Sequence, residues 1–197
     1  MTKATALLIF AALAAAPGGY SAAGKALGNP KAPVRIDLYS DFQCPSCKVF
    51  HDGTFGPLVA KYVMTGKVYL RQHEYPLPMH AHAREAACLA CAADKCGRYW
   101  QVCDALFQTQ DSWAKDGKVA AAACSVLTPI EAAQVQALAR TPAILDAVND
   151  DIRSGQTEQV NGTPTMIITK LMRRYPVAGP VSFPVLSRFL DSLIESQ

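Results

Sequence analysis

The order in which strand-like and helix-like patterns follow one another restricts the fold of this chain more than any other feature. Residues 34–39 and 68–73 alternate apolar and polar side chains and are rich in β-formers, so we expect a strand at each. Near the C-terminus, residues 165–169 and 173–177 show strand patterns again, and an amphipathic helix is expected at 183–193. Strands therefore lie toward both ends of the chain.

The middle of the chain differs in composition and in pattern. From about residue 80 to residue 153 it is rich in alanine and lacks strand patterns. Gly97 separates the first two expected helices, and two Thr-Pro pairs mark the starts of later ones. The expected helices are 80–94, 98–109, 115–125, 129–139 and 142–153. One α/β sheet interrupted by a single all-helical insertion explains this order better than two successive domains.

The first 23 residues carry the features of a secretory signal peptide. Lys3 precedes eleven uninterrupted apolar residues, Ala6 to Ala16. This run is too short for a membrane helix, which needs roughly 20 residues, but it suits a signal peptide. A buried N-terminal helix, the alternative, would normally carry polar residues on one face. The small residues Ser21 and Ala23 predict cleavage after Ala23, so we expect a soluble mature protein in the periplasm or the extracellular space.

The composition narrows the class of protein further. A chain of 197 residues with 50% apolar and 18% charged residues is neither disordered, collagen-like nor a coiled coil. The net charge of +3 is too small to indicate a nucleic acid or an anionic membrane as partner. Seven cysteines are too few for a small disulfide scaffold, yet too many to be incidental thiols in an oxidising compartment.

The motif Cys44-Pro45-Ser46-Cys47 stands where the first strand ends and a helix is expected to begin. Partial positive charge at a helix N-terminus favours the Cys44 thiolate, which makes this sulfur the nucleophile, and Cys47 on the first turn can close a disulfide with it. Pro45 presets the first helical φ angle, whereas Gly53 and Gly56-Pro57 predict a break further along. Half of a zinc site and an inert structural disulfide have the same cysteine spacing and remain alternatives to redox use.

Four segments in a fixed order carry a family resemblance: Gly28–Val34, Tyr39–Cys47, Pro76–Ala87 and Val160–Thr165. From about Gly28 to its C-terminus the chain therefore resembles the DsbA-like thiol-disulfide oxidoreductases of the thioredoxin superfamily. The resemblance implies an α/β thioredoxin fold with an inserted all-helical domain. It also implies that the first motif cysteine is exposed and attacks, and that the second resolves the mixed disulfide.

The same resemblance gives roles to residues outside the two cysteines. It implies a cis bond between Thr163 and Pro164 that directs the Thr163 backbone across the active site, where an extended substrate can pair with it. Pro45 and Ser46 are expected to tune the redox pair. The chain then divides into a signal peptide at 1–23, the two parts of the thioredoxin fold at 24–79 and 154–197, and the helical insert at 80–153.

One position departs from the family pattern. Relatives often carry an acid six residues before the first active-site cysteine, and this chain has Leu38 there. The adjacent Asp37 is expected to face the other side of the sheet, because side chains alternate along a strand. We therefore expect proton transfer to and from Cys47 to use water or Glu74.

Five further cysteines lie in the expected insert. Cys91 and Cys103 are each six residues from Gly97, so a helical hairpin at this glycine predicts a structural disulfide between them. A Cys96–Cys103 pairing is the nearest alternative, and a zinc or copper site is another. Cys88 can instead meet Cys124 on a later helix, which leaves Cys96 as the odd thiol near the loop.

Four histidines complete the candidate residues. His51 follows Cys47 by four residues and either tunes the redox pair or packs. His80 and His82 are expected to cap or pack at the opening of the insert, and a metal site shared with His73 is the alternative. We predict no metal.

Together these features predict an enzyme that donates its Cys44–Cys47 disulfide to folding proteins, without a cofactor and without a nucleic acid partner. By resemblance, its reoxidation requires a membrane quinone reductase of the DsbB-like or vitamin K epoxide reductase-like type. A reductase or isomerase of the same fold is the alternative. A non-enzymatic, cysteine-rich metal-binding or chaperone module is the alternative from a different class.

Overall fold

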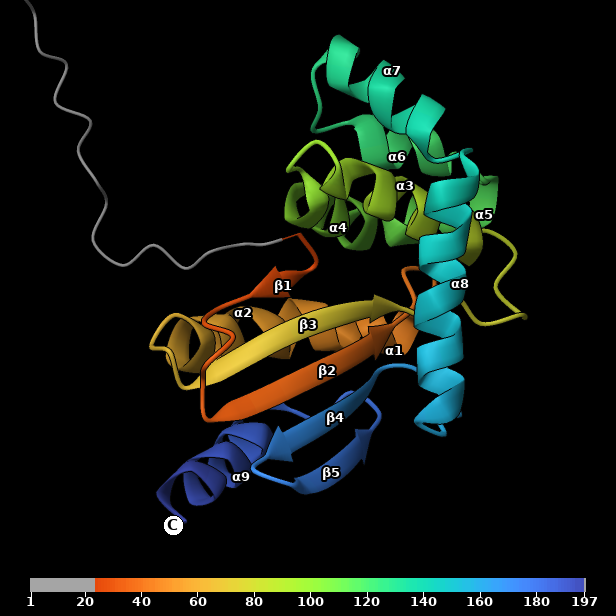
Figure 1. Ribbon diagram of the computed structural model, residues 1–197. Coiled ribbons are helices and arrows are strands. Elements are labelled where there is room, and N and C mark those ends of the chain that lie inside the picture. The colour runs from red at the N-terminus through yellow and green to blue at the C-terminus, as the bar shows by residue number, and fades with distance from the viewer. Residues whose placement is uncertain (1–23, 197) are drawn as a thin grey trace, which may run out of the picture.

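The computed structural model describes residues 24–196, so the predicted signal peptide lies outside the described residues. Five strands form one mixed sheet in the order β1-β3-β2-β4-β5 (Figure 1). Only β2 and β3 pair in parallel, and the other neighbouring strands are antiparallel. The strands are β1 (Ala26–Leu27), β2 (Val34–Ser40), β3 (Val68–Glu74), β4 (Thr165–Lys170) and β5 (Arg173–Ala178).

Helices cover both faces of the sheet. One face packs against a long helical segment that begins with α1 (Pro45–Phe50), and against α9 (Phe183–Glu195). The opposite face packs against α8 (Pro142–Thr157). The close approach of α8 requires Gly155, because a Cβ atom there would lie 2.4 Å from the Tyr75 ring.

The break expected near Gly53 does not occur, so that prediction is wrong. The segment stays helical from Pro45 to Val63, with α2 (Gly56–Leu58) between two π-helical stretches at His51–Phe55 and Val59–Val63. A proline ring collides with the carbonyl four residues earlier in a regular α-helix. Widening the turns before Pro57 lets the helix continue.

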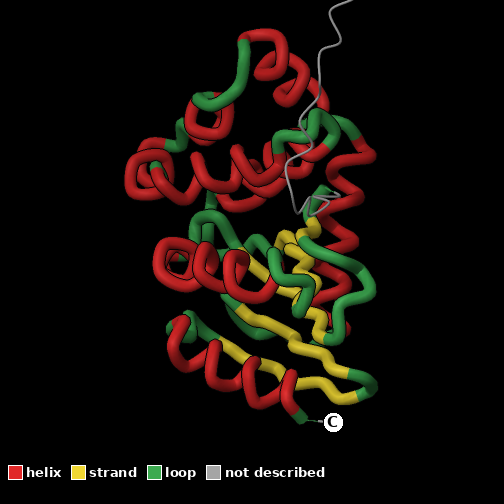
Figure 2. The backbone as a smooth tube through the Cα atoms, turned by 90° about the vertical axis from the view of Figure 1, so that its left-hand side faces the viewer, coloured by secondary structure: helices red, strands yellow, loops and turns green. Residues whose placement is uncertain are grey.

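The insertion is helical throughout and forms its own layer beyond one end of the sheet (Figure 2). Its core combines small alanine and cysteine side chains with larger aliphatic and aromatic ones, among them the fully buried Trp113. The expected helix 115–125 is instead two helices, because Gly117 in the left-handed conformation (φ 72°) ends the first of them. The insert helices are α3 (Ala83–Asp94), α4 (Tyr99–Gln108), α5 (Gln110–Asp116), α6 (Val119–Cys124) and α7 (Pro129–Leu138).

Candidate active site

The two motif cysteines lie where β2 passes into α1. Cys44 is the N-cap of α1, and Pro45 occupies the first helical position, as predicted. The Cys44 residue is 7% exposed and Cys47 is 1% exposed. The exposure that the family resemblance implies for Cys44 is therefore small in this structure, because the residue packs into the same apolar cluster as the insert.

The environment of Cys44 stabilises its thiolate. A hydrogen bond from the Cys47 side chain is the largest contribution and, with further donors, lowers the pKa of Cys44 from its ordinary value of 9.0 to about 5, although burial opposes the shift. The other donors are Thr163 and the backbone N–H groups of Cys47 and Ser46. Ser46 thus acts through its backbone at the helix N-terminus.

The environment of Cys47 has the opposite effect. Burial raises the pKa of this thiol well above its ordinary value, and its hydrogen bond to Cys44 raises it further. Two groups on the β2 side partly offset the rise: the Asp41 N–H, 3.4 Å from Cys47 Sγ, and the Ser40 side chain. The pair therefore consists of one readily ionised thiol and one that holds its proton.

The loop before β4 completes the site from the other end of the chain. The peptide bond between Thr163 and Pro164 is cis, as the family resemblance implies. The Cys44 thiol donates to the Thr163 carbonyl at 3.4 Å, so the Thr163 backbone does lie across the active site. The Thr163 hydroxyl is buried with no geometrically defined hydrogen-bond partner, although its position lowers the pKa of Cys44.

Sequence analysis missed the polar contacts that hold the turn before the motif. The Asp41 carboxylate is completely buried and accepts from the Gln43 N–H (2.7 Å), the Leu77 N–H (2.8 Å) and His80 Nδ1 (2.7 Å). These contacts tie the turn to the segment that leads into the insert. An Asp in the turn three residues before the motif is a usable signal, since Asp side chains often bond backbone N–H groups two residues on.

A second contact comes from within the insert. The buried Gln110 side chain donates to the Phe42 carbonyl at 2.6 Å and to the Cys44 carbonyl at 3.1 Å. No local sequence pattern identifies a glutamine 66 residues away as part of the site. The insert thus positions the start of α1 directly.

The histidines pack or pair with acids. The ring of His51 stacks on Phe107 at 4.6 Å and bonds to Asp104 at 2.9 Å. The backbone N–H of His82 donates to Gln43, and the side chain of His80 bonds to Asp41. Within residues 24–196, no group of three or more His, Cys, Asp or Glu side chains is arranged to hold a metal ion.

A fourth histidine confirms the face assignment of the strand before the motif. His73 bonds to Asp37 and to Asp151 of α8, each at 2.9 Å. The side chain of Asp37 therefore faces α8, whereas Leu38 belongs to the core on the α1 face. Asp37 therefore lies on the sheet face opposite to α1 and Cys47, as expected.

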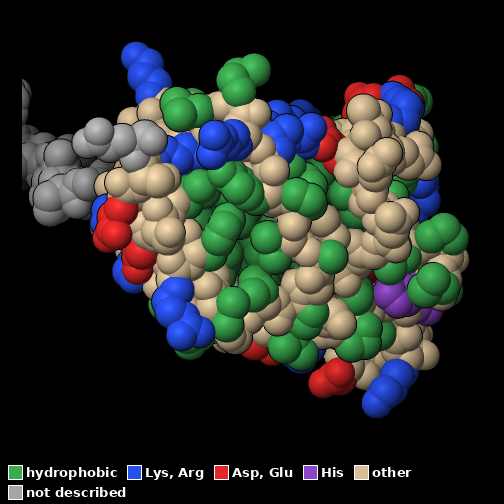
Figure 3. All heavy atoms as spheres, turned by 90° about the horizontal axis from the view of Figure 1, so that it is seen from below, with side chains coloured by type: hydrophobic (Ala, Val, Ile, Leu, Met, Phe, Trp, Pro, Cys, Tyr) green, Lys and Arg blue, Asp and Glu red, His purple; other side chains and the backbone are tan. Residues whose placement is uncertain are grey.

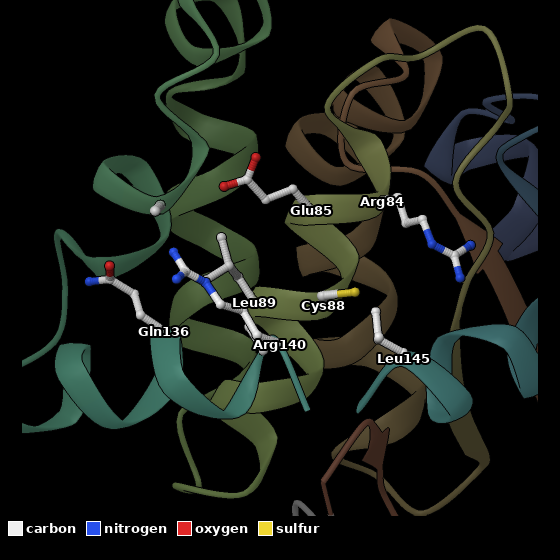
Figure 4. Close-up of a pocket in the computed structure, with 9 residues that line it drawn as sticks. Arg84, Glu85, Cys88, Leu89, Gln136, Arg140 and Leu145 are labelled. Carbon is white, nitrogen blue, oxygen red and sulfur yellow. The ribbon is translucent and has the colours of Figure 1, made fainter. Parts of the chain in front are cut away.

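The insert cysteines are all free thiols in this structure. Cys91 and Cys103 are both buried, on the neighbouring helices α3 and α4, and their predicted disulfide stays a prediction. Cys88 lines a pocket of about 430 Å³ between α3 and the segment from α7 to α8 (Figure 4). Burial raises the pKa of Cys88 and of Cys91, so neither is an activated thiol.

An apolar surface lies on another side of the molecule. Figure 3 views the face toward α9 and β5 from below and shows hydrophobic side chains gathered in its middle. Val185 of α9 is one of the exposed large apolar residues of the chain.

Fold and site together define a thioredoxin-superfamily architecture in which a helical insertion interrupts the sheet. Residues 21–191 match the thioredoxin family, and the chain belongs to this family. α-DsbA1 of Wolbachia pipientis has a similar structure, with a TM-score of 0.73 and 24% identity over 86% of this chain and 90% of that one. The predicted DsbA-like class and the predicted fold are thereby confirmed.

Two relatives show similarity in sequence. The Na⁺/H⁺ antiporter NhaA 1 of Mycolicibacterium gilvum is 30% identical over 153 residues, which are 76% of this chain and 24% of that protein. The chain thus spans about a quarter of the length of this relative. A probable disulfide bond formation protein D of Bacillus cereus is 23% identical over 149 residues, 73% of this chain and 69% of that protein. Among residues 24–196, no helix is both long and apolar enough to cross a membrane.

Proposed function

We propose that this protein is a thiol-disulfide oxidoreductase that introduces disulfides into folding proteins through Cys44 and Cys47. The observation that supports this proposal is the opposite perturbation of the two thiols, since the pKa of Cys44 is lowered to about 5 and that of Cys47 is raised. A pair of this kind provides one good leaving group and one sulfur that returns to the neutral thiol.

The reaction proceeds in two exchanges. A substrate thiolate attacks Cys44 Sγ of the oxidised pair, the Cys44–Cys47 bond breaks, and Cys47 leaves with the electron pair and takes up a proton. A second substrate thiolate then attacks the substrate sulfur of the mixed disulfide, and Cys44 leaves as its stable thiolate. The substrate loses two electrons, and the enzyme pair gains them.

The low pKa of Cys44 favours this direction. At pH 7 a thiol of pKa 9.0 is about 1% ionised, whereas one of pKa about 5 is about 99% ionised. The reduced state gains a factor of about 100, and this makes a two-electron disulfide about 60 mV more oxidising. We therefore propose a reduction potential above the thioredoxin value of about −270 mV.

The location and partners follow from the same proposal. The signal-peptide features of residues 1–23 support secretion to the periplasm or the extracellular space, where protein disulfides persist. The substrates are unfolded or folding proteins with free thiols, and the backbone of Thr163 is available to pair with an extended segment. Reoxidation is assigned to a membrane quinone reductase of the DsbB-like or vitamin K epoxide reductase-like type.

Trapping tests the proposal. Cys47→Ser should accumulate mixed disulfides between Cys44 and substrate proteins, whereas Cys44→Ser should not, because only Cys44 is attacked. Equal trapping by the two variants would contradict these roles. A potential at or below about −270 mV against glutathione would instead indicate a reductase.

A further inference from the structure

Glu74 is a buried acid that the disulfide exchange described above does not use. It is the last residue of β3, and its side chain is 0% exposed. The Tyr99 hydroxyl donates to Glu74 Oε1, but Oε2 is buried without a hydrogen-bond partner. Buried polar atoms are nearly always paired, so this free oxygen needs an explanation.

The strand register places Glu74 beside Ser40. The two residues are Cα partners in the parallel pair of β2 and β3. The backbone N–H of Tyr75 donates to the Ser40 carbonyl at 2.8 Å, so the strands remain together at this end. Partner residues have side chains on the same face, and adjacent strands lie about 4.8 Å apart. This face is the one against which α1 packs, because Leu38, two residues before Ser40, lies in that core.

Ser40 connects this acid to the active site. The next residue, Asp41, donates its backbone N–H to Cys47 Sγ at 3.4 Å, which places the end of β2 against this sulfur. The side chain of Ser40 lowers the pKa of the same thiol. Glu74, Ser40 and Cys47 therefore follow one another on the α1 face of the sheet. We propose that Glu74 exchanges a proton with Cys47 through the Ser40 hydroxyl, in place of the acid that Leu38 does not provide. This inference rests on the proposed function.

The proton balance of the step is simple. When a substrate thiolate attacks Cys44, Cys47 Sγ leaves with the electron pair of the disulfide and takes the hydroxyl proton of Ser40. Ser40 Oγ takes the carboxyl proton of Glu74 at the same time. A thiolate and a carboxylic acid become a thiol and a carboxylate, so charge is conserved. In the reverse direction the Glu74 carboxylate accepts the proton as Cys47 attacks a mixed disulfide.

The surroundings keep this carboxyl able to hold or release a proton near neutral pH. Burial raises the pKa of Glu74 to about 7, opposed mainly by the charge of Lys25. A general acid or base works best when its pKa is close to the working pH. The titratable groups that face Glu74 are Lys25, His73 and Asp151, with Tyr99 and Cys103 on α4 and Cys88 and Cys91 on α3.

The pH dependence of single-turnover oxidation of a dithiol peptide tests the proposal. In the unaltered protein the acid form of Glu74 assists Cys47, and this assistance declines as pH rises through about 7. Glu74→Gln keeps the shape and an acceptor for Tyr99 but cannot give up a proton in this way. We expect the rate of this variant to be about 100-fold lower at pH 6, because general acid catalysis contributes at least about 100-fold to a rate. The difference between the two proteins should disappear above pH 8. Parallel pH profiles for the two proteins would overturn the proposal.

Substitutions of Ser40 separate the relay from a packing effect and carry the test if Glu74→Gln does not fold. Ser40→Ala should show the same pH-dependent loss, and Ser40→Thr, which keeps the hydroxyl, should restore the rate. The exposed residues Glu85 and Ser112 supply the controls, because Glu85→Gln and Ser112→Ala should leave the profile unchanged. A pH-independent loss in Ser40→Ala would refute the relay.

A second reaction keeps the relay distinct from the oxidase proposal. In the reduced protein, Cys44 attacks an aromatic disulfide and releases one coloured thiol. Cys47 then attacks the mixed disulfide and releases the second. This reaction can be measured whether the enzyme acts as an oxidase or as a reductase in its own compartment. In this step the Glu74 carboxylate is the base, so the difference from Glu74→Gln should be largest above pH 7. If the unaltered protein fails to oxidise peptides but the rate of this second reaction still changes through about pH 7, the oxidase function alone is contradicted. If the unaltered protein oxidises peptides but this rate does not change through about pH 7, the relay alone is contradicted.

Discussion

Replacing Thr163 with valine should raise the pKa of Cys44 and make the disulfide less oxidising. The Thr163 hydroxyl is buried, and its interaction with Cys44 lowers the pKa of that thiol. Valine has nearly the same shape but no hydroxyl, so it removes this interaction while the backbone stays in place. A hydrogen bond to a charged group is worth about 1.5–3 kcal/mol, and 1.36 kcal/mol corresponds to one pKa unit.

These values predict a shift of about one to two units, from a pKa of about 5 to about 6–7. At pH 7 the reduced state then loses a factor of about 10 to 50, which lowers the reduction potential by about 30–50 mV. The direction follows because the thiolate exists only in the reduced protein. Removing its stabilisation therefore disfavours reduction.

Two measurements check this prediction. Thiolate absorbance in the ultraviolet, followed against pH, gives the pKa of Cys44, and equilibration with glutathione gives the potential. Thr157→Val, at an exposed threonine of α8, is the matched control and should change neither value. If the pKa of Cys44 stays near 5 in Thr163→Val, the hydroxyl does not stabilise the thiolate and this reasoning is wrong.

Two further predictions concern stability. The acids that bond to His73 raise its pKa above 6.5, so its contribution to the free energy of unfolding is complete below pH 6.5 and is lost as pH rises through the folded value. The pKa of Asp37 is lowered to about 2, so its contribution is lost as pH falls from about 4 to 2. Urea unfolding of His73→Asn across pH 5–8 should lack the first change, and a slope equal to that of the unaltered protein would contradict it. In protein oxidised in vitro, peptide mapping without reductant should recover Cys91 linked to Cys103, and the double serine variant should be less stable by about 3 kcal/mol. Any other partner for Cys91 would mean that the expected helical hairpin at Gly97 does not pair these two cysteines.

Periodicity predicted the elements that have enough residues to show it. The strands around residues 34–40 and 165–170 and the helix beginning at Phe183 lie close to their expected positions. The two-residue strand Ala26–Leu27 was not predicted, because two residues have no period and their pairing with β3 depends on the folded sheet. Gly117 was likewise overlooked within the expected helix 115–125.

Some residues of the candidate site were predicted from the sequence, and others were not. The motif cysteines and the cis bond before Pro164 were predicted, since a local motif and a family resemblance point to them. Gln110 was not, because its hydrogen bonds to the start of α1 exist only after the insert has packed on the sheet. Glu74 was named from the sequence as a proton acceptor, but its pairing with Ser40, on which the proposed relay rests, is visible only in the strand register.

The difference between the two thiols depends on both parts of the fold. The N–H groups at the start of α1 and the loop before β4 help lower the pKa of Cys44, and both belong to the sheet domain. Burial raises the pKa of Cys47, and this sulfur lies in the same apolar cluster as the insert side chains Phe107 and Trp113. A substitution in the insert can therefore change the redox pair without touching the motif. The insert therefore contributes to the burial that raises the pKa of Cys47.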